Sequence, residues 1–317
     1  MNKTSLRLIH LHRSKAVTRP LIRKILSKDP YLENIYRHDP SALSQYLSLT
    51  SPRAFQLYQD LHNPQLIQTI KNDCQTYHVI TILDSTYPPL LRTIIDPPYV
   101  LYLLGNEKLL TELPSLSVVG TRNPSPEAKR KMNKIITPLI LENWVIVSGM
   151  AKGIDGIAHQ LAIENNGKTI AVVGSGFQHV YPKQHVNLFY ELARKQLIIS
   201  EYPPNIPARR HHFPERNRLI SGLGTGTIVV EAKEKSGSLI TVDQALDQGR
   251  DVYAIPGSPL FEQTSGCHKM IQDGAKLVQN THDITEDWTN NQGKWCRILS
   301  DNTECKLVNG TKNEFHV

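Results

Sequence analysis

The segment ARRHHFPERNR, residues 208–218, holds the densest group of side chains that could bind an anion. Its four arginines, which fall within ten residues, are Arg209, Arg210, Arg216 and Arg218. Asn217 adds an amide beside the last two, and Phe213 adds an aromatic ring. Guanidinium groups bind phosphate through paired hydrogen bonds, and aromatic rings stack on bases. The composition is typical of a groove that follows a nucleic-acid backbone; a solvated charged surface is the simpler alternative.

Other candidate anion-binding residues follow short apolar runs. They lie in the segments VGTRNPS, SGMAKGIDG, VYPKQ and KSGSLIT, and they are Gly120, Arg122, Ser148, Gly149, Lys152, Lys183, Ser236 and Ser238. Glycine and serine permit tight turns before a helix, where free backbone amides and the helix dipole attract anions. The simpler alternatives are a solvated arginine in an ordinary turn and serine acting only as a helix cap.

Catalytic and metal-binding motifs are scarce. Asp155 and His159 are four apart on a predicted helix, a spacing that favours a structural contact over catalysis. The chain has no G-x-x-x-x-G-K-[ST] loop, no H-E-x-x-H and no G-x-S-x-G. GSGFQH departs from the dinucleotide fingerprint because His179 replaces its third glycine. The four cysteines form no C-x-x-C pair, so neither a zinc site nor a disulfide framework is indicated, and no cofactor is expected.

The elements that would position these residues follow from composition and periodicity. The 317 residues carry a net charge of +7, and 39% of them are hydrophobic, as in a globular protein with polyanionic partners. No signal peptide or membrane span is recognisable, so we expect a cytoplasmic protein with no membrane partner. Residues 1–77 have helical spacing, residues 78–284 form a second domain, and 285–317 are expected to be a short polar tail too short for a further domain.

The second domain alternates short apolar runs with amphipathic helices. The runs LSVVG, WVIVSG, TIAVVGSG, LIIS, TIVVEA and DVYAIPG are rich in β-branched residues, which is typical of parallel strands buried on both faces. We therefore predict an α/β fold with a doubly wound, mainly parallel Rossmann-like sheet. Its ligand crevice would lie at the carboxyl ends of the strands, where the candidate residues are found.

The longer motifs together resemble those of the DprA/Smf family of bacterial DNA-processing proteins. They are VGTRNPS, SGMAKGIDGIAHQLAI, TIAVVGSGFQHVYPKQHVNL, ISEYPP, FPERNRLISGL, VVEAKEKSGSLIT and GRDVYAIPG, in the family's order and spacing over roughly residues 80–280. The resemblance implies an extended Rossmann domain preceded by a small SAM-like helical domain. Longer members carry a carboxyl-terminal winged-helix domain, which we expect to be missing here.

The resemblance also implies a function without catalysis. Family members bind single-stranded DNA, form homodimers and load the RecA recombinase during natural transformation. Carried over by motif, the DNA-binding residues would be Arg122, Lys183, Arg216, Asn217 and Arg218. The family's dimer surface would fall near Leu246, Ile271 and Leu277.

Two questions stay open in the sequence. Arg216 and Arg218 diverge if their segment is helical, so we expect one to face the groove with Asn217 and the other to bind an acid such as Glu231. The alternative function is a LOG-type nucleotide phosphoribohydrolase or a nucleotide-binding protein, because GLGTGTIVVE is similar to the motif of those enzymes. Against it, the segment lacks Pro-Gly and Glu231 is displaced by one residue, which reverses its face in a strand.

Overall fold

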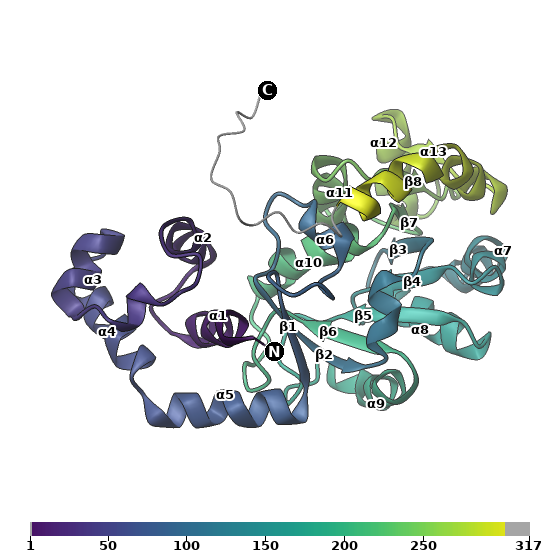
Figure 1. Ribbon diagram of the computed structural model, residues 1–317. Helices are drawn as coiled ribbons and strands as arrows, with labels where there is room; N and C mark the ends of the chain where they lie inside the picture. Colours follow the sequence, from purple (N-terminus) through teal and green to yellow (C-terminus); the bar gives the residue numbers. More distant parts are fainter. Residues whose placement is uncertain (1, 302–317) are drawn as a thin grey trace.

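In the computed structural model, which describes residues 2–301 with side chains to residue 298, five helices precede the first strand. They are α1 (Lys3–Arg13), α2 (Arg19–Lys28), α3 (Pro40–Leu47), α4 (Ser51–Leu61) and α5 (Pro64–Thr76), with a 3-10 turn η1 at Asn34–Tyr36. Proline at the first or second position starts four of them (α2–α5), where its missing N–H costs nothing. Figure 1 shows this helical domain beside the sheet, with α1 and α2 between the outer helices and the strands.

The remainder of the described chain is built on one nine-stranded sheet of order β1-β2-β6-β5-β4-β3-β7-β8-β9. The strands are β1 (His78–Thr81), β2 (Val100–Gly105), β3 (Ser115–Val119), β4 (Val145–Ser148), β5 (Lys168–Val172), β6 (Leu197–Ser200), β7 (Gly226–Val229), β8 (Asp251–Ala254) and β9 (Lys276–Leu277). β3 to β9 pair in parallel, and β1 and β2 extend the sheet antiparallel beyond β6. The predicted α/β class and the mainly parallel Rossmann-like sheet are confirmed.

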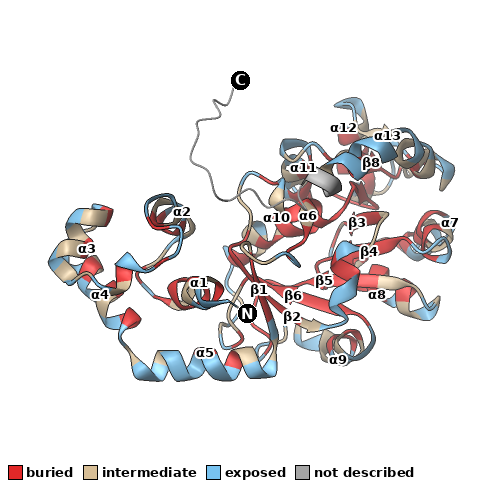
Figure 2. Cartoon of the chain, in the orientation of Figure 1, coloured by how far each residue is buried: buried red, intermediate tan, exposed pale blue. Residues whose placement is uncertain are grey.

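Helices cover both faces of this sheet. They are α6 (Pro89–Arg92), α7 (Ala128–Leu141), α8 (Ile154–Glu164), α9 (Val186–Lys195), α10 (His212–Leu223), α11 (Ser238–Asp247), α12 (Ser265–Gln272) and α13 (His282–Asp301), with 3-10 turns η2 (Glu107–Thr111), η3 (Lys183–His185) and η4 (Glu262–Thr264). Side chains alternate along a strand, so β4 places Val145 and Val147 in the core under α10 and Ile146 in the core under α7 and α8. Figure 2 shows the strands buried and the outer helical faces exposed.

A third core joins the helical domain to the sheet. Leu8, Leu11 and Ile25 of the first two helices share it with Tyr102 of β2 and Ile198 of β6. The change of composition near residue 78 therefore coincides with the start of β1, but apolar contact continues across it. Among the described residues no helix is both long and apolar enough to cross a membrane.

The carboxyl-terminal part departs from the expected polar tail. Residues 282–301 form helix α13, on which Ile284, Trp288 and Trp295 recur at spacings of four and seven and so share one face. Trp288 meets Trp144 with ring centroids 5.9 Å apart, and Trp295 is 1% exposed with the Arg250 guanidinium 4.8 Å from its ring. Three large apolar side chains are enough to dock an otherwise polar helix. The rest of the expected tail, residues 302–317, lies outside the described residues.

Candidate functional site

A cleft of about 570 Å³ opens at the carboxyl ends of β3, β4 and β7, between the starts of α10 and α11. Its lining residues come from five loops or helix starts: Val119, Gly120, Arg122, Ala151, Asp155, Tyr181, Arg210, Phe213, Pro214, Arg216, Asn217, Ile220, Ser236, Gly237, Ser238, Ile240 and Thr241. A smaller hollow of about 40 Å³ adjoins it and adds Gly149, Lys152, Gly174, Ser175 and Pro182. The topology thus brings residues from separate loops to the edge where a ligand crevice was predicted.

The cations of the cleft lie at two depths. Arg122 and Arg210 are exposed at its rim, and Lys152 is exposed at the rim of the smaller hollow. Arg216 is buried at the floor. Asp155 is the one carboxylate among the lining residues, and it is buried beside Arg216. The accessible surface of the cleft is therefore positive.

Arg216 is held by main-chain oxygens. Its Nη1 donates to the carbonyl of Gly149 at 2.5 Å and to that of Val172, and its Nε donates to the Asn217 amide oxygen at 3.2 Å. A Cβ on Gly149 would lie 2.4 Å from Arg216 Nη1 and 2.6 Å from Asp155 Oδ2, so a larger residue there would displace this charged pair. Nε and Nη1 are thus engaged by the protein itself, and the residue lines the cleft.

Burial acts on both charged groups at the floor. It lowers the pKa of Arg216 to about 10, which still leaves the guanidinium protonated at neutral pH. It also raises the pKa of Asp155, although the Arg216 charge and the amides of Ala151 and Gly149 work in the opposite direction. Burial therefore disfavours the charged form of both groups, and their attraction for each other partly offsets this cost.

Two aromatic rings form one wall. Tyr181 and Phe213 lie with centroids 5.3 Å apart, and the Arg122 guanidinium is 5.9 Å from the centre of the Phe213 ring. The cleft is also lined by the start of α11, where Ser236 and Gly237 precede the helix, Ser238 is its first residue, and the two serine hydroxyls are 2.7 Å apart. The cleft thus combines flat apolar rings with cations and a helix amino terminus, a combination suited to both bases and phosphates.

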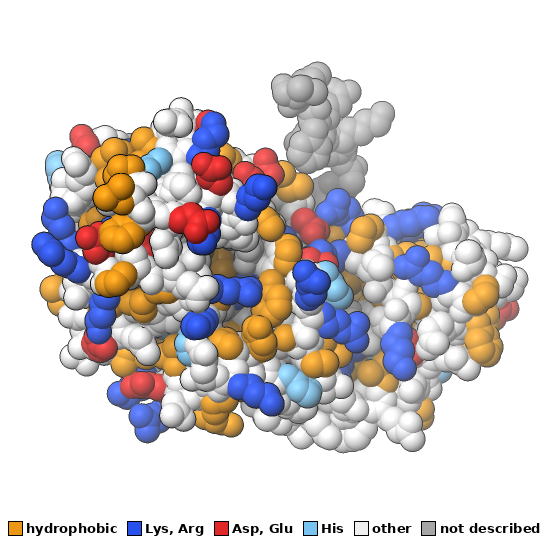
Figure 3. All heavy atoms as spheres, turned by 180° about the vertical axis from the view of Figure 1, so that it is seen from behind, with side chains coloured by type: hydrophobic (Ala, Val, Ile, Leu, Met, Phe, Trp, Pro, Cys, Tyr) orange, Lys and Arg blue, Asp and Glu red, His pale blue; other side chains and the backbone are white. Residues whose placement is uncertain are grey.

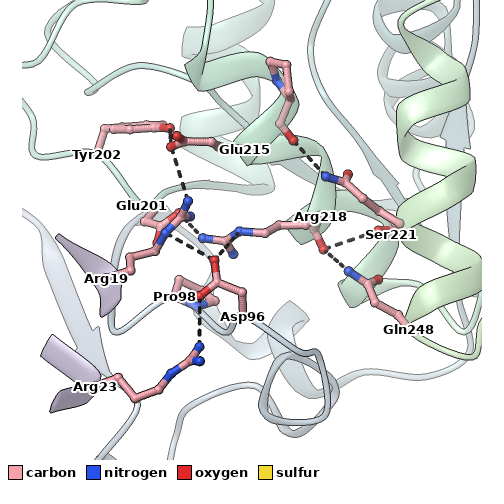
Figure 4. Close-up of polar contacts among 12 residues, drawn as sticks. Arg19, Arg23, Asp96, Pro98, Glu201, Tyr202, Glu215, Arg218, Ser221 and Gln248 are labelled. Atoms are coloured by element: carbon pink, nitrogen blue, oxygen red, sulfur yellow. Dashed lines mark hydrogen bonds and ion pairs between the residues drawn. The ribbon is translucent and has the colours of Figure 1, made fainter. Parts of the chain in front are cut away.

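Arg218 faces away from the cleft into a buried ion network, shown in Figure 4. Its Nη2 is 2.5 Å from Glu201 Oε2, and its Nε is 3.7 Å from Asp96. Arg19 of α2 reaches the same two carboxylates at 3.4 and 3.2 Å and lies 3.7 Å from Glu215. Burial lowers the pKa of Arg19, but these three carboxylates outweigh it and raise the pKa.

The structure resolves which arginine faces the groove: Arg216 does, next to Asn217. The expected partner of the other arginine was wrong, because Arg218 binds Glu201 rather than Glu231. Glu231 is fully buried and accepts from the Ser125 amide at 2.8 Å and from Lys131 Nζ at 2.8 Å. The sequence could not reveal this pairing, since Glu201 and Asp96 reach Arg218 only through the folding of separate loops.

Three candidate residues lie apart from the cleft. Ser148 is buried and donates its hydroxyl to the Val118 carbonyl at 2.6 Å, which is a structural role. Lys183 is exposed in η3 and does not line either hollow. His159 bonds Thr169 Oγ1 at 2.7 Å rather than Asp155, so the expected pair does not form. Tyr181 was missed as a wall residue; its position beside Pro182 in the VYPK turn was the available signal.

The three residues expected at a dimer surface lie on the far side of the sheet from β1. Leu246 of α11 is 60% exposed and Leu277 of the edge strand β9 is 39% exposed, whereas Ile271 of α12 is partly buried. Elsewhere, the face shown in Figure 3 carries Lys and Arg side chains around a central hollow.

Comparison with known proteins places this geometry in a family. Residues 78–289 match the family model described as DNA recombination-mediator protein A. The DNA processing protein DprA of Bacillus subtilis is 45% identical over 213 residues, which cover 67% of this chain and 72% of that protein.

Two solved structures are also similar. The X-ray structure of DprA from Streptococcus pneumoniae aligns with a TM-score of 0.78 and 38% identity, covering 90% of this chain and 98% of that one. DprA from Helicobacter pylori, described for its single-stranded DNA binding mode, aligns with a TM-score of 0.61 and 27% identity over 68% of this chain and 97% of that one. The match over most of the α/β domain, together with the motifs that line the cleft, shows that the chain belongs to the DprA/Smf family of DNA-processing proteins.

Proposed function

We propose that the cleft binds single-stranded DNA without sequence preference. The observation that carries this proposal is the meeting of Arg122, Arg210 and Arg216 with the Tyr181–Phe213 ring pair at one sheet edge. The relative from Helicobacter pylori, whose printed description is of single-stranded DNA binding, supports the same ligand class. A single strand exposes both its phosphates and the faces of its bases, which a duplex does not.

The proposed mechanism divides the work between charge and stacking. Arg122 and Arg210 neutralise successive phosphates at the rim, and Arg216 adds its charge at the floor. Bases stack on Phe213 and Tyr181, an interaction that every base can make. Phosphate contacts position a strand without reading its sequence, so affinity should vary little with base composition.

The wider role follows as part of the same proposal. A family of recombination mediators that holds single strands is suited to protecting incoming DNA in the cytoplasm and transferring it to the RecA recombinase during natural transformation. A homodimer through Leu246, Ile271 and Leu277 would present two clefts to one strand. Size-exclusion chromatography with light scattering tests the dimer: Leu246→Glu should yield monomers, and an unchanged mass would remove this surface from the proposal.

A binding role is favoured over nucleotide hydrolysis by the position of Glu231. The carboxylate that would serve as the catalytic acid in the alternative enzyme is enclosed by Ser125 and Lys131 and does not line the cleft. Asp155, the carboxylate that does line it, is buried against Arg216.

Fluorescence anisotropy with labelled oligo-dT across a salt series tests the cleft. Arg122→Ala combined with Lys152→Ala should weaken binding by on the order of tenfold and flatten the plot of log affinity against log salt by up to ~1.4, since each single-strand phosphate contact contributes ~0.7. Lys108→Ala is the charge control, because Lys108 is exposed in η2 at the opposite edge of the sheet. Equal behaviour of the double variant and wild type would remove the cleft as the DNA site, and binding of free nucleotides alone would favour the alternative.

A further inference from the structure

The positive charge of the chain is concentrated in the helical domain. Residues 1–77 contain 11 Lys and Arg against 5 Asp and Glu, whereas residues 78–317 contain 25 against 24. The domain that carries the cleft is therefore nearly neutral overall, and the domain beside it carries almost all of the net charge of +7. Such a charge excess is the usual signature of a polyanion-binding surface.

Part of this excess is consumed by contacts inside the protein. Arg19 and Arg23 of α2 reach carboxylates of the α/β domain, Arg23 at 3.5 Å from Asp96. Lys15 and Arg53 are different, because neither forms an ion pair with a described carboxylate. Lys15 is exposed, and Arg53 donates Nε to the Ala16 carbonyl at 2.8 Å. Lys15 lies in the turn between α1 and α2, and Arg53 of α4 bonds that turn at Ala16 and Thr18, so two cations without a carboxylate partner among the described residues meet there.

This turn adjoins the loop that forms one end of the cleft. Arg13, at the end of α1, donates to the Asn205 side chain at 2.9 Å. Asn205 belongs to the loop between β6 and α10, in which Arg209 and Arg210 are exposed and Arg210 lines the cleft. The five steps along the chain from Asn205 to Arg210 span at most ~17 Å. Unpaired cations thus follow one another from the cleft to the helical domain.

We propose that the α1–α2 turn is a second DNA contact, which extends the strand's path out of the cleft. A strand that leaves past Arg210 would cross Arg209 and bring its next phosphates to Lys15 and Arg53. This inference rests on the proposed function of the cleft. An anionic lipid surface would also suit Lys15 and Arg53, but continuity with a cleft lined by aromatic rings favours a nucleic acid.

Two oligonucleotide lengths separate this contact from the cleft. A labelled oligo-dT of about 6 nucleotides reports the cleft alone, and one of about 20 reports cleft and turn, because single-strand sites span ~4–16 nucleotides per domain. The test variant is Lys15→Ala combined with Arg53→Gln. The control variant, Lys3→Ala combined with Arg37→Ala, removes the same charge from the same domain beside Glu33, near the start of α1. At 0.15 M salt the Debye length is ~8 Å, so charges that do not lie close to the bound strand have little influence on its binding. Removal of a distant pair of cations should therefore change affinity little.

The expected result is a loss of affinity on the order of tenfold and a salt slope lower by up to ~1.4 for the long oligonucleotide with the test variant only. Binding of the short oligonucleotide should be unchanged in both variants. The single variant Arg53→Lys keeps the positive charge, so its affinity for the long oligonucleotide should stay close to that of the wild type. This comparison separates the effect of charge from any loosening of the turn.

The second contact would be overturned if the test variant bound the long oligonucleotide as well as the wild type, or if the test and control variants lost affinity equally. It would also be overturned if the test variant lost binding to vesicles of anionic phospholipid while its DNA binding stayed intact. Failure of the short oligonucleotide to bind the wild type would instead count against the cleft itself. The two proposals therefore fail in different ways.

Discussion

Arg216 and Arg218 stand two residues apart on α10, and both guanidinium groups are buried, yet their surroundings differ in kind. Arg218 is neutralised by Glu201 and Asp96 from its own chain. Arg216 meets carbonyl oxygens and one carboxylate whose pKa is raised, and it lines the cleft. The difference teaches that two buried arginines on one helix can be neutralised to different extents: Arg218 is paired with carboxylates, whereas Arg216 bonds mainly neutral carbonyl groups, which is why we propose Arg216 as the ligand-binding one.

The largest effect should come from removing a carboxylate that neutralises Arg218. Glu201→Ala leaves Arg218 buried without its nearest carboxylate and should lower the free energy of unfolding by about 3–5 kcal/mol. Chemical denaturation measures it, with Glu191→Ala, which removes a carboxylate paired only along its own surface helix, as a control expected within ~0.5 kcal/mol. The double variant Glu201→Met with Arg218→Met should recover most of the lost stability, because it leaves no unpaired buried charge at these two positions. If stability is not recovered, the network does more than neutralise Arg218.

His159 is a third buried titratable group, and unlike Arg216 and Arg218 it has a neutral hydrogen-bond partner, Thr169. Burial lowers its pKa to about 3 from the ordinary 6.5. Between these values the unfolded chain binds a proton that the folded protein does not, so stability decreases as pH falls, by up to ~1.4 kcal/mol per pH unit. Stability measured from pH ~7 to ~4 should fall less steeply in His159→Gln than in wild type. Parallel pH profiles would show that His159 is protonated inside the fold.

On the ligand side, the ring wall should contribute without any charge. Phe213→Ala should weaken binding of oligo-dT by about 1–3 kcal/mol and leave the salt slope unchanged. Tyr31→Ala removes an exposed ring in the helical domain, away from the cleft, and should have no effect. A changed salt slope in Phe213→Ala would indicate that the ring acts by positioning Arg122 rather than by stacking.

The smallest effect should come from keeping the charge at Arg216 and changing its shape. Arg216→Lys retains a cation but loses the planar fork that bonds Gly149 and Val172. We expect affinity for oligo-dT to fall by no more than about tenfold, or ~1.4 kcal/mol, with the salt slope kept. A loss as large as that of Arg216→Ala would show that geometry outweighs charge at the floor.

Much of the α/β domain was predictable because its strands are buried on both faces. Such strands read as continuous β-branched runs, and LIIS, for example, coincides with β6 (Leu197–Ser200). Parallel topology brings the loops that follow the strands to one edge, which predicts that Arg122, Arg216 and Ser238 share one crevice, and all three line the cleft.

What the sequence could not predict depends on distant partners. The choice between Glu201 and Glu231 for Arg218 rests on where residues 96 and 201 meet α2, which no local pattern encodes. Helix α13 was missed because only three apolar residues mark its buried face among polar neighbours. Ser148 resembled a phosphate-binding serine, but its hydroxyl is satisfied by Val118 of the adjacent strand.

The core shared by α1, α2, β2 and β6 has a consequence for how the protein unfolds. A fragment starting at residue 78 would present Tyr102 and Ile198 to water, because the helices that cover them precede that residue. The two domains should therefore melt in one cooperative transition, and the truncated fragment should aggregate unless those faces are made polar. We therefore expect the boundary in composition not to be a boundary in folding.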